Sequence, residues 1–161
     1  MHTFGHMRRS GFTLIELVIV VVVIGILAAI AVPRMSRGAS AASEASLTAS
    51  LTSMRNGMDL FYTEHGDTYP PLAKVSEALT QFSDSTFATY DTRQNSATGV
   101  IFGPYVRKIP TLPVGASKGK TAFVATIGGD GGWVYDATTG LIKANCADSE
   151  VDGRGVKFNT Y

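Results

Sequence analysis

The chain opens on a short polar stretch, which a long hydrophobic run follows. The run extends from Phe12 to Val32, and only Thr13, Glu16 and Gly25 interrupt it. As an α-helix it would rise about 1.5 Å per residue and span roughly 30 Å, the thickness of a bilayer's hydrocarbon core. It has no polar stripe at helical period, unlike the core helix of a soluble domain. The pattern therefore predicts a transmembrane helix over residues 12–33.

Downstream of Pro33 the pattern becomes that of an amphipathic helix. Apolar side chains recur at alternating steps of four and three residues, the spacing of one helical face, at Leu47, Leu51, Met54, Met58 and Phe61. His65-Gly66-Asp67 ends the pattern, so we expect the helix to continue to about Glu64. Pro33 removes one backbone hydrogen bond and predicts a kink between the two halves.

The rest of the chain predicts a small globular head with short elements. These are a helix over 74–82, a polar loop over 83–99, a strand over 121–127, and a hairpin of 133–135 with 141–144. We expect Trp133 and Tyr135 to pack on the long helix. The expected fold class is α+β, with a long N-terminal helix packed on a small antiparallel β-sheet head.

The distribution of charge predicts how the chain is oriented in the membrane. Arg8 and Arg9 stand just before the hydrophobic run, and the first eleven residues contain no acidic side chain. Basic residues flanking a membrane span favour its cytoplasmic side, so the head is expected on the far side of the membrane. The expected organisation is a basic leader at 1–11, a membrane helix at 12–33, an amphipathic helix at 34–65 and a head at 66–161.

Glu16 is the unusual residue of the hydrophobic run. A carboxylate four residues inside a membrane helix costs several kcal/mol unless it is paired or reaches the interface. It either extends to the headgroups from near the helix end, or it is a functional charge that awaits a partner. On the hydrophobic pattern alone, both interpretations stay open.

The segment Gly11-Phe12-Thr13-Leu14-Ile15-Glu16-Leu17, between a basic leader and a membrane span, resembles the processing site of type IV prepilins and pseudopilins. The resemblance extends from Arg8 to Pro33, because the family commonly has a proline where the membrane helix emerges. It implies that a prepilin peptidase cleaves the Gly11–Phe12 bond on the cytoplasmic side and N-methylates Phe12. It also implies that Glu16 is the glutamate found four residues after the new N-terminus.

The resemblance gives Glu16 a partner. Cleavage leaves a cationic amine at Phe12, which the Glu16 carboxylate of a neighbouring subunit could pair with in a low dielectric. The implied partners are the peptidase and methyltransferase, like subunits, an assembly ATPase and inner-membrane platform proteins. The implied location is the bacterial inner membrane, with a single span and a periplasmic head, and then a filament.

Two other interpretations compete for the N-terminal segment. Ala29-Ile30-Ala31 resembles the cleavage site of a secretory signal peptide, but the hydrophobic run is longer than a signal core and contains Glu16. A plain signal anchor for a periplasmic binding domain explains the span but not the Phe-Thr-Leu-Ile-Glu sequence.

The head resembles that of G-type pseudopilins, the major subunits of type II secretion systems. Asp67-Thr68-Tyr69-Pro70 resembles their turn after the long helix, and Gly103-Pro104-Tyr105 starts a second similar segment. The expected Pro-Trp-Gly after that segment is absent, since Leu112-Pro113-Val114-Gly115 stands there. A type II secretion pseudopilin is therefore the first hypothesis, and a type IV pilus subunit for adhesion, motility or DNA uptake is the alternative.

Composition excludes several other classes of function. Net charge is +1, which gives no reason to expect nucleic-acid binding. Cys146 is the single cysteine, so no intrachain disulfide is expected, and we expect it to be a small buried side chain. The glycines around Lys118 lack the spacing of a phosphate-binding loop, and no catalytic motif is present, so the chain is not expected to be an enzyme.

One metal hypothesis remains, near the C-terminus. Asp148, Glu150 and Asp152 alternate before Gly153, as acidic ligands do at the start of a calcium loop. Glu150 replaces the usual Asp or Asn, and the twelfth position is Asn159 rather than Glu. G-type pseudopilins carry calcium near the C-terminus, so the resemblance keeps Ca²⁺ as a possible cofactor; no other cofactor is expected.

Overall fold

The computed structural model describes residues 12–161, with the side chains of residues 32–37 outside the description. The chain divides into two compact units, one extending to Ala39 and the other comprising Ser40–Tyr161. Each unit is described by itself below.

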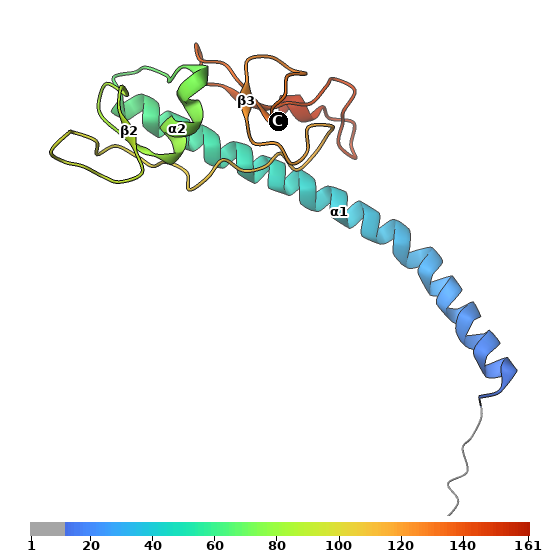
Figure 1. Ribbon diagram of the computed structural model, residues 1–161. Helices are drawn as coiled ribbons and strands as arrows, with labels where there is room; N and C mark the ends of the chain where they lie inside the picture. The colour runs from blue at the N-terminus through green and yellow to red at the C-terminus, as the bar shows by residue number, and fades with distance from the viewer. Residues whose placement is uncertain (1–11) are drawn as a thin grey trace, which may run out of the picture. The chain divides into compact units, whose positions relative to one another are not determined.

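Helix α1 comprises Leu14–Glu64 and contributes to both units (Figure 1). It ends where the sequence predicts. Gly66 adopts a left-handed conformation, with φ of 62°, and the Asp67 N–H donates to the Tyr62 carbonyl at 3.0 Å. This six-residue hydrogen bond around a left-handed glycine is a Schellman-type helix end. The helical assignment continues through Pro33, whose side chain lies outside the described residues, so the kink stays a prediction.

The second unit adds short elements around α1. They are the 3₁₀ turn η1 (Leu72–Lys74), α2 (Val75–Thr80), β1 (Phe82–Ser83), β2 (Tyr90–Asp91), β3 (Phe123–Val124), β4 (Trp133–Tyr135), β5 (Ile142–Ala144) and the 3₁₀ turn η2 (Phe158–Thr160). β1 and β2 form an antiparallel pair, and β3, β4 and β5 form a second sheet in that order. The predicted helix after the long helix is therefore present, and the α+β class is confirmed.

The three-stranded sheet corrects one prediction. β4 and β5 pair antiparallel, with Tyr135 opposite Ile142, as the predicted hairpin requires. β3 pairs parallel to β4, with Phe123 opposite Trp133, so the sheet is mixed rather than antiparallel. The strand predicted over 121–127 is only two residues long, because the chain already bends at residues 125–126, before the glycine-rich loop at 128–132.

The core forms where the apolar stripe of α1 meets this sheet. All five stripe residues from Leu47 to Phe61 are buried, as predicted. Trp133 and Tyr135 are buried in the same cluster as Leu47, Leu51, Met54 and Met58. Their polar atoms are satisfied: the Tyr135 hydroxyl donates to the Pro70 carbonyl at 2.8 Å, and the Trp133 indole donates to the Pro110 carbonyl at 2.9 Å. The predicted packing of both aromatic residues is confirmed.

Candidate processing and assembly site

Helix α1 begins with reciprocal hydrogen bonds between Thr13 and Glu16. The Thr13 backbone N–H and hydroxyl both donate to one Glu16 carboxylate oxygen, at 2.8 and 2.6 Å. In return, the Glu16 backbone N–H donates to the Thr13 hydroxyl oxygen at 3.3 Å. This arrangement is a capping box, which satisfies backbone donors that a helix start leaves without partners. The Glu16 carboxylate therefore points back toward the residues that precede the helix.

The predicted cleavage and methylation position lies beside this cap. Phe12 directly precedes Thr13 and is 80 % exposed. Gly11 lies outside the described residues, so the bond between them is at the edge of the description. Cleavage there would leave a cationic amine one residue before the cap, at the same helix end as the Glu16 carboxylate.

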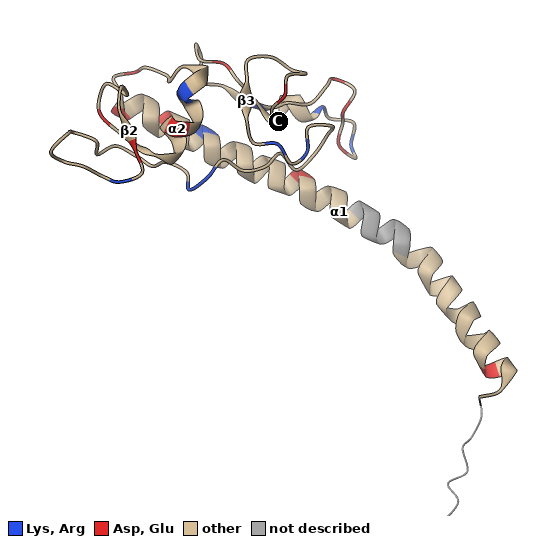
Figure 2. Ribbon diagram, in the orientation of Figure 1, with Lys and Arg blue, Asp and Glu red and all other residues tan. Residues whose placement is uncertain are grey.

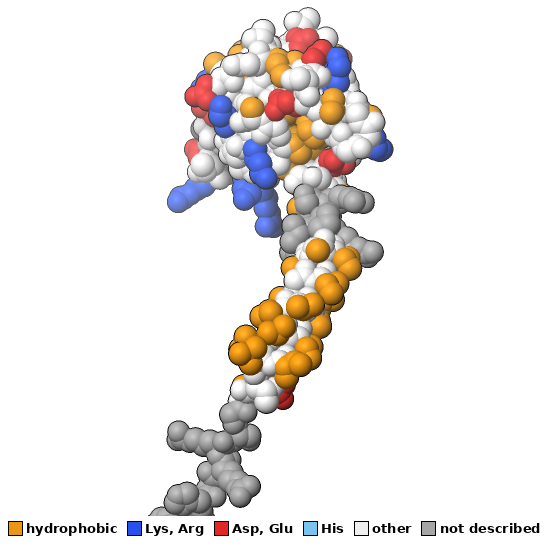
Figure 3. All heavy atoms as spheres, turned by 90° about the vertical axis from the view of Figure 1, so that its right-hand side faces the viewer, with side chains coloured by type: hydrophobic (Ala, Val, Ile, Leu, Met, Phe, Trp, Pro, Cys, Tyr) orange, Lys and Arg blue, Asp and Glu red, His pale blue; other side chains and the backbone are white. Residues whose placement is uncertain are grey.

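Beyond Glu16, the helix presents an apolar surface. Leu14–Ala31 has a mean hydropathy of 3.1, and none of its residues is buried against the rest of the protein. Figure 3 shows hydrophobic side chains covering this part of the helix. Its length and composition are those of a single membrane span, as predicted.

The three acidic residues of the calcium hypothesis have separate hydrogen-bond partners. Asp148 accepts from the Lys157 ammonium at 2.7 Å and from the Asn159 side-chain amide at 2.8 Å. Glu150 accepts from two backbone N–H groups, those of Ala116 and Ala147. Each carboxylate thus already has donors from within the protein.

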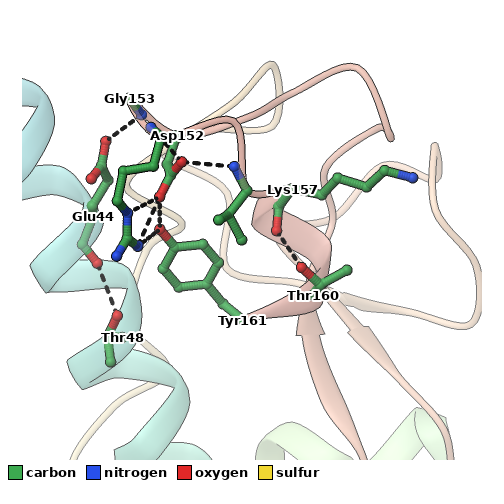
Figure 4. A network of polar contacts seen from close by, with 9 residues as sticks. Glu44, Thr48, Asp152, Gly153, Lys157, Thr160 and Tyr161 are labelled. Atoms are coloured by element: carbon green, nitrogen blue, oxygen red, sulfur yellow. Dashed lines mark hydrogen bonds and ion pairs between the residues drawn. The ribbon is translucent and has the colours of Figure 1, made fainter.

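Asp152 is the most enclosed of the three, because its side chain is fully buried. One oxygen accepts from the Tyr161 hydroxyl at 2.7 Å and from the Arg154 guanidinium at 2.8 and 2.9 Å (Figure 4). The other accepts from the backbone N–H groups of Arg154 and Val156, each at 2.8 Å. The Tyr161 hydroxyl, with these N–H donors, holds the pKa of Asp152 well below its usual range despite the opposing effect of burial.

This geometry does not fit a shared calcium ion. Ca²⁺ takes six to eight oxygen ligands at about 2.3–2.6 Å, and it needs carboxylates that converge on one point. Among the described residues, no three His, Cys, Asp or Glu side chains form such a group. The Arg154 guanidinium supplies the positive charge beside Asp152, so Ca²⁺ binding gains no support from the arrangement.

Two residues of α1 that sequence reasoning did not single out connect the helix to the C-terminal segment and to the sheet. The Glu44 carboxylate accepts from the Gly153 N–H at 3.3 Å. Arg55 donates from two guanidinium nitrogens to the Ile142 carbonyl, at 2.8 and 3.0 Å. Arg55 occupies a polar position within the stripe and Glu44 a polar position just before it. Their partners lie far away in sequence, so the helical pattern carries no signal for them.

Cys146 is fully buried in the core cluster, as predicted. Burial, followed by the nearby charge of Glu150, raises the pKa of the thiol to about 11. Because the thiolate is the reactive form of cysteine, this thiol has the character of a packing residue rather than a reactive one.

Comparison with protein families finds one match, at the N-terminus. The family model described as the prokaryotic N-terminal methylation motif matches residues 6–32. The match contains Gly11, Phe12 and Glu16 and the whole apolar surface of Leu14–Ala31. Comparisons with curated proteins and with solved structures give no significant match. The chain therefore carries at its N-terminus the signature of the type IV pilin superfamily.

Proposed function

We propose that this chain is the precursor of a structural subunit of a type IV pilus-like filament. The observation that carries the proposal is the methylation motif over residues 6–32, with its Glu16 in a capping box at the start of an exposed apolar helix. The subunit is cleaved after Gly11, is N-methylated at Phe12, and waits in the membrane before assembly.

The capping box supports the proposed role of Glu16. In the unassembled chain, Thr13 supplies the carboxylate with two donors, which lowers the cost of a charge inside a membrane segment. In a filament, the Phe12 amine of a neighbour adds a positive charge at the same helix end. A subunit added at the wrong axial position would leave its Glu16 away from the neighbour's amine. The pairing therefore favours one axial register.

The proposed location and partners follow from this role. The proposed location is the bacterial inner membrane, with Arg8 and Arg9 on the cytoplasmic side and the unit from Ser40 onward in the periplasm; the apolar span and the basic leader support it. A prepilin peptidase processes it, and an assembly ATPase with platform proteins adds it to a filament of like subunits. Its role is structural, not enzymatic.

The proposed system is type II secretion, in which the subunit is a pseudopilin. The resemblance at Asp67-Thr68-Tyr69-Pro70 and at Gly103-Pro104-Tyr105 supports this choice. In the fold, the Pro70 carbonyl accepts a hydrogen bond from the Tyr135 hydroxyl. Tyr105 packs beside Gly57 of α1, so both segments contribute to the packing of the head. A type IV pilus subunit is the alternative. Deleting the gene should impair protein secretion in the first case and surface fibres in the second.

Intact mass and N-terminal sequencing of the protein from its native membrane test the proposal. A mature chain that begins with N-methylated Phe12 is the expected result. Gly11→Val should block processing, whereas Gly38→Val, a matched change at a glycine with open space around it, should not. A chain that begins at Met1 or Val32 would contradict the proposal, since it would indicate a plain anchor or a released domain.

Deletion of the gene then separates the two systems. Loss of secreted enzymes from the medium, with surface fibres retained, indicates a secretion pseudopilin. Loss of surface fibres, adhesion, motility or DNA uptake, with secretion intact, indicates a pilus subunit.

A further inference from the structure

A groove runs beside α1 on the unit from Ser40 to Tyr161. It consists of two adjoining hollows of about 490 and 350 Å³, which share Ser46. The segment 105–119 forms one wall. The α1 wall contains only small side chains: Ala42, Ser43, Ser46, Ala49, Ser50 and Ser53. Small residues allow another polypeptide to approach the helix closely.

Three basic side chains line this groove, namely Arg107, Lys108 and Lys118. All three are exposed, and none forms an ion pair or side-chain hydrogen bond with the residues that the structure describes. Lys120, by contrast, pairs with Asp130 at 2.9 Å. Figure 2 shows basic residues on the loop segments that pass beside α1. The groove therefore has a positive rim whose charge the described part of the chain does not neutralise.

An acidic surface lies at the C-terminal end of α1. Asp59 and Asp67 are both exposed, and neither forms an ion pair within the described residues. Asp59 lies one helical turn before Tyr62, and the Asp67 N–H donates to the Tyr62 carbonyl at 3.0 Å. The charges of both carboxylates add to desolvation and to Tyr62 in raising the pKa of Tyr69. Asp59 and Asp67, which flank Tyr62 in this way, are called the acidic patch below; the Tyr62 ring stacks on that of Tyr69.

The groove and the acidic patch lie on different sides of the helix and at different heights. At 3.6 residues per turn, Asp59 is roughly a third of a turn from the Ser46–Ser53 wall and about 15 Å further along the axis from Ala49. A two-fold dimer would have to bring both surfaces of each copy into one interface, which this separation around and along the helix disfavours. A head-to-tail contact between two different surfaces leaves one of each free on every added copy, and where its rotation does not close into a ring it produces an open filament.

We infer that the groove of one subunit receives the acidic patch of a second copy of this chain, with Arg107, Lys108 and Lys118 facing Asp59 and Asp67. The inference rests on the proposed filament function and names its contact on the head. Exposed ion pairs contribute little binding free energy, whereas like charges that face each other are costly. These charges would therefore select the register in which two heads meet, and would add little to the affinity of the contact. A net charge of only +1 and a matching acidic patch on the same chain favour a second copy over nucleic acid or anionic lipid.

Charge reversal in the full-length chain, in its native host, tests the inference. Arg107→Glu with Lys108→Glu should lower the yield of sheared filaments by about tenfold, because opposed like charges disfavour the contact. Adding Asp59→Lys and Asp67→Lys should restore most of that yield. The control is Arg93→Glu with Lys143→Glu, which reverses two exposed charges away from the groove and should leave the yield near that of the unmodified chain.

Cysteine pairing gives a second measurement that does not depend on reversing charge. Lys108→Cys with Asp59→Cys should yield covalent ladders upon oxidation of assembled filaments, whereas Lys143→Cys with Asp59→Cys should remain mostly monomeric. The native thiol of Cys146 is buried and should not contribute.

Three results would overturn the inference: equal losses in the reversal and the control variants, no rescue by the acidic-to-basic changes together with no ladder, or an effect of reversal on lipid binding alone. If the unmodified chain is processed and assembles while the reversal variant assembles equally well, the head contact fails and the proposed function stands. If the unmodified chain forms no filament, the proposed function itself fails, and the inference falls with it.

Discussion

Arg55 of α1 donates a 2.6 Å hydrogen bond to the main-chain oxygen of Tyr161, 106 residues later in the sequence. The same guanidinium donates to the Ile142 carbonyl in β5. One half-buried cation thus joins the helix, the sheet and the C-terminal segment, all through backbone oxygens rather than through an acidic side chain. Desolvation lowers the pKa of Arg55, although the guanidinium stays charged at physiological pH.

This relationship predicts a loss of stability when the guanidinium is removed. Arg55→Leu should lower the free energy of unfolding by about 2 kcal/mol, because hydrogen bonds to a charged group are each worth roughly 1.5–3 kcal/mol. Arg55→Lys should fall between, since an ammonium cannot reproduce the planar fork. Urea unfolding of the full chain in mild detergent, followed by fluorescence of the single Trp133, measures both. Arg93→Leu is the exposed control, and an equal loss there would contradict the assignment.

Asp152 predicts how the stability of the head depends on pH. Its folded-state pKa lies below the unfolded value of about 3.9, so the unfolded chain binds more protons as the pH falls. The stability that ionised Asp152 contributes is therefore present above about pH 4 and is lost as pH falls through its folded-state pKa. In a plot of the free energy of unfolding against pH, Asp152→Asn should make the decrease at acid pH shallower. Asp130→Asn, whose side chain is 95 % exposed, should leave that decrease unchanged.

Calcium should have little effect on the same segment. Both Asp152 oxygens already accept hydrogen bonds from Arg154, Val156 or Tyr161, so Ca²⁺ would have to displace them. We expect the unfolding temperature of the full chain to be the same in excess Ca²⁺ and in EDTA. A rise with Ca²⁺ that Asp152→Asn abolishes would show that the acidic residues rearrange around the ion, as their spacing alone suggests.

The sequence predicts those features of the fold whose causes are local. The stripe from Leu47 to Phe61 predicts burial directly, because residues three and four apart lie on one face of a helix and an apolar face packs into the core. The helix end was predictable for a similar reason, since Gly66 readily adopts the left-handed conformation that stops a helix.

The features that the sequence does not reveal depend on distant partners. The Asn145 side chain donates to the carbonyls of Gly129 and Gly131 and accepts from the Gly128 N–H, which fixes the glycine loop and lets β3 lie parallel to β4. An alternating pattern cannot indicate such an arrangement, because it does not say which residue pairs with which strand. The spacing of Asp148, Glu150 and Asp152 likewise does not show that each carboxylate accepts hydrogen bonds from different donors, so that the three do not converge on one point.

At the N-terminus, the cap and the charge of Glu16 can be separated by mutation. Glu16→Gln keeps an oxygen that can accept from Thr13 but removes the negative charge, whereas Thr13→Val keeps the charge and removes the hydroxyl. If Glu16 acts by pairing with the Phe12 amine of a neighbour, Glu16→Gln should be processed normally but should form few filaments.

Thr13→Val should have a smaller effect on filament yield, because the backbone N–H of residue 13 still donates to Glu16. Thr13→Ser, which keeps the hydroxyl, is its matched control and should assemble like the unmodified chain. Yields of sheared filaments, normalised to the processed chain in the membrane, measure all three variants. Normal assembly of Glu16→Gln with failure of Thr13→Val would reverse the assignment: the carboxylate would then serve to start the helix, and the intersubunit charge pair would be dispensable.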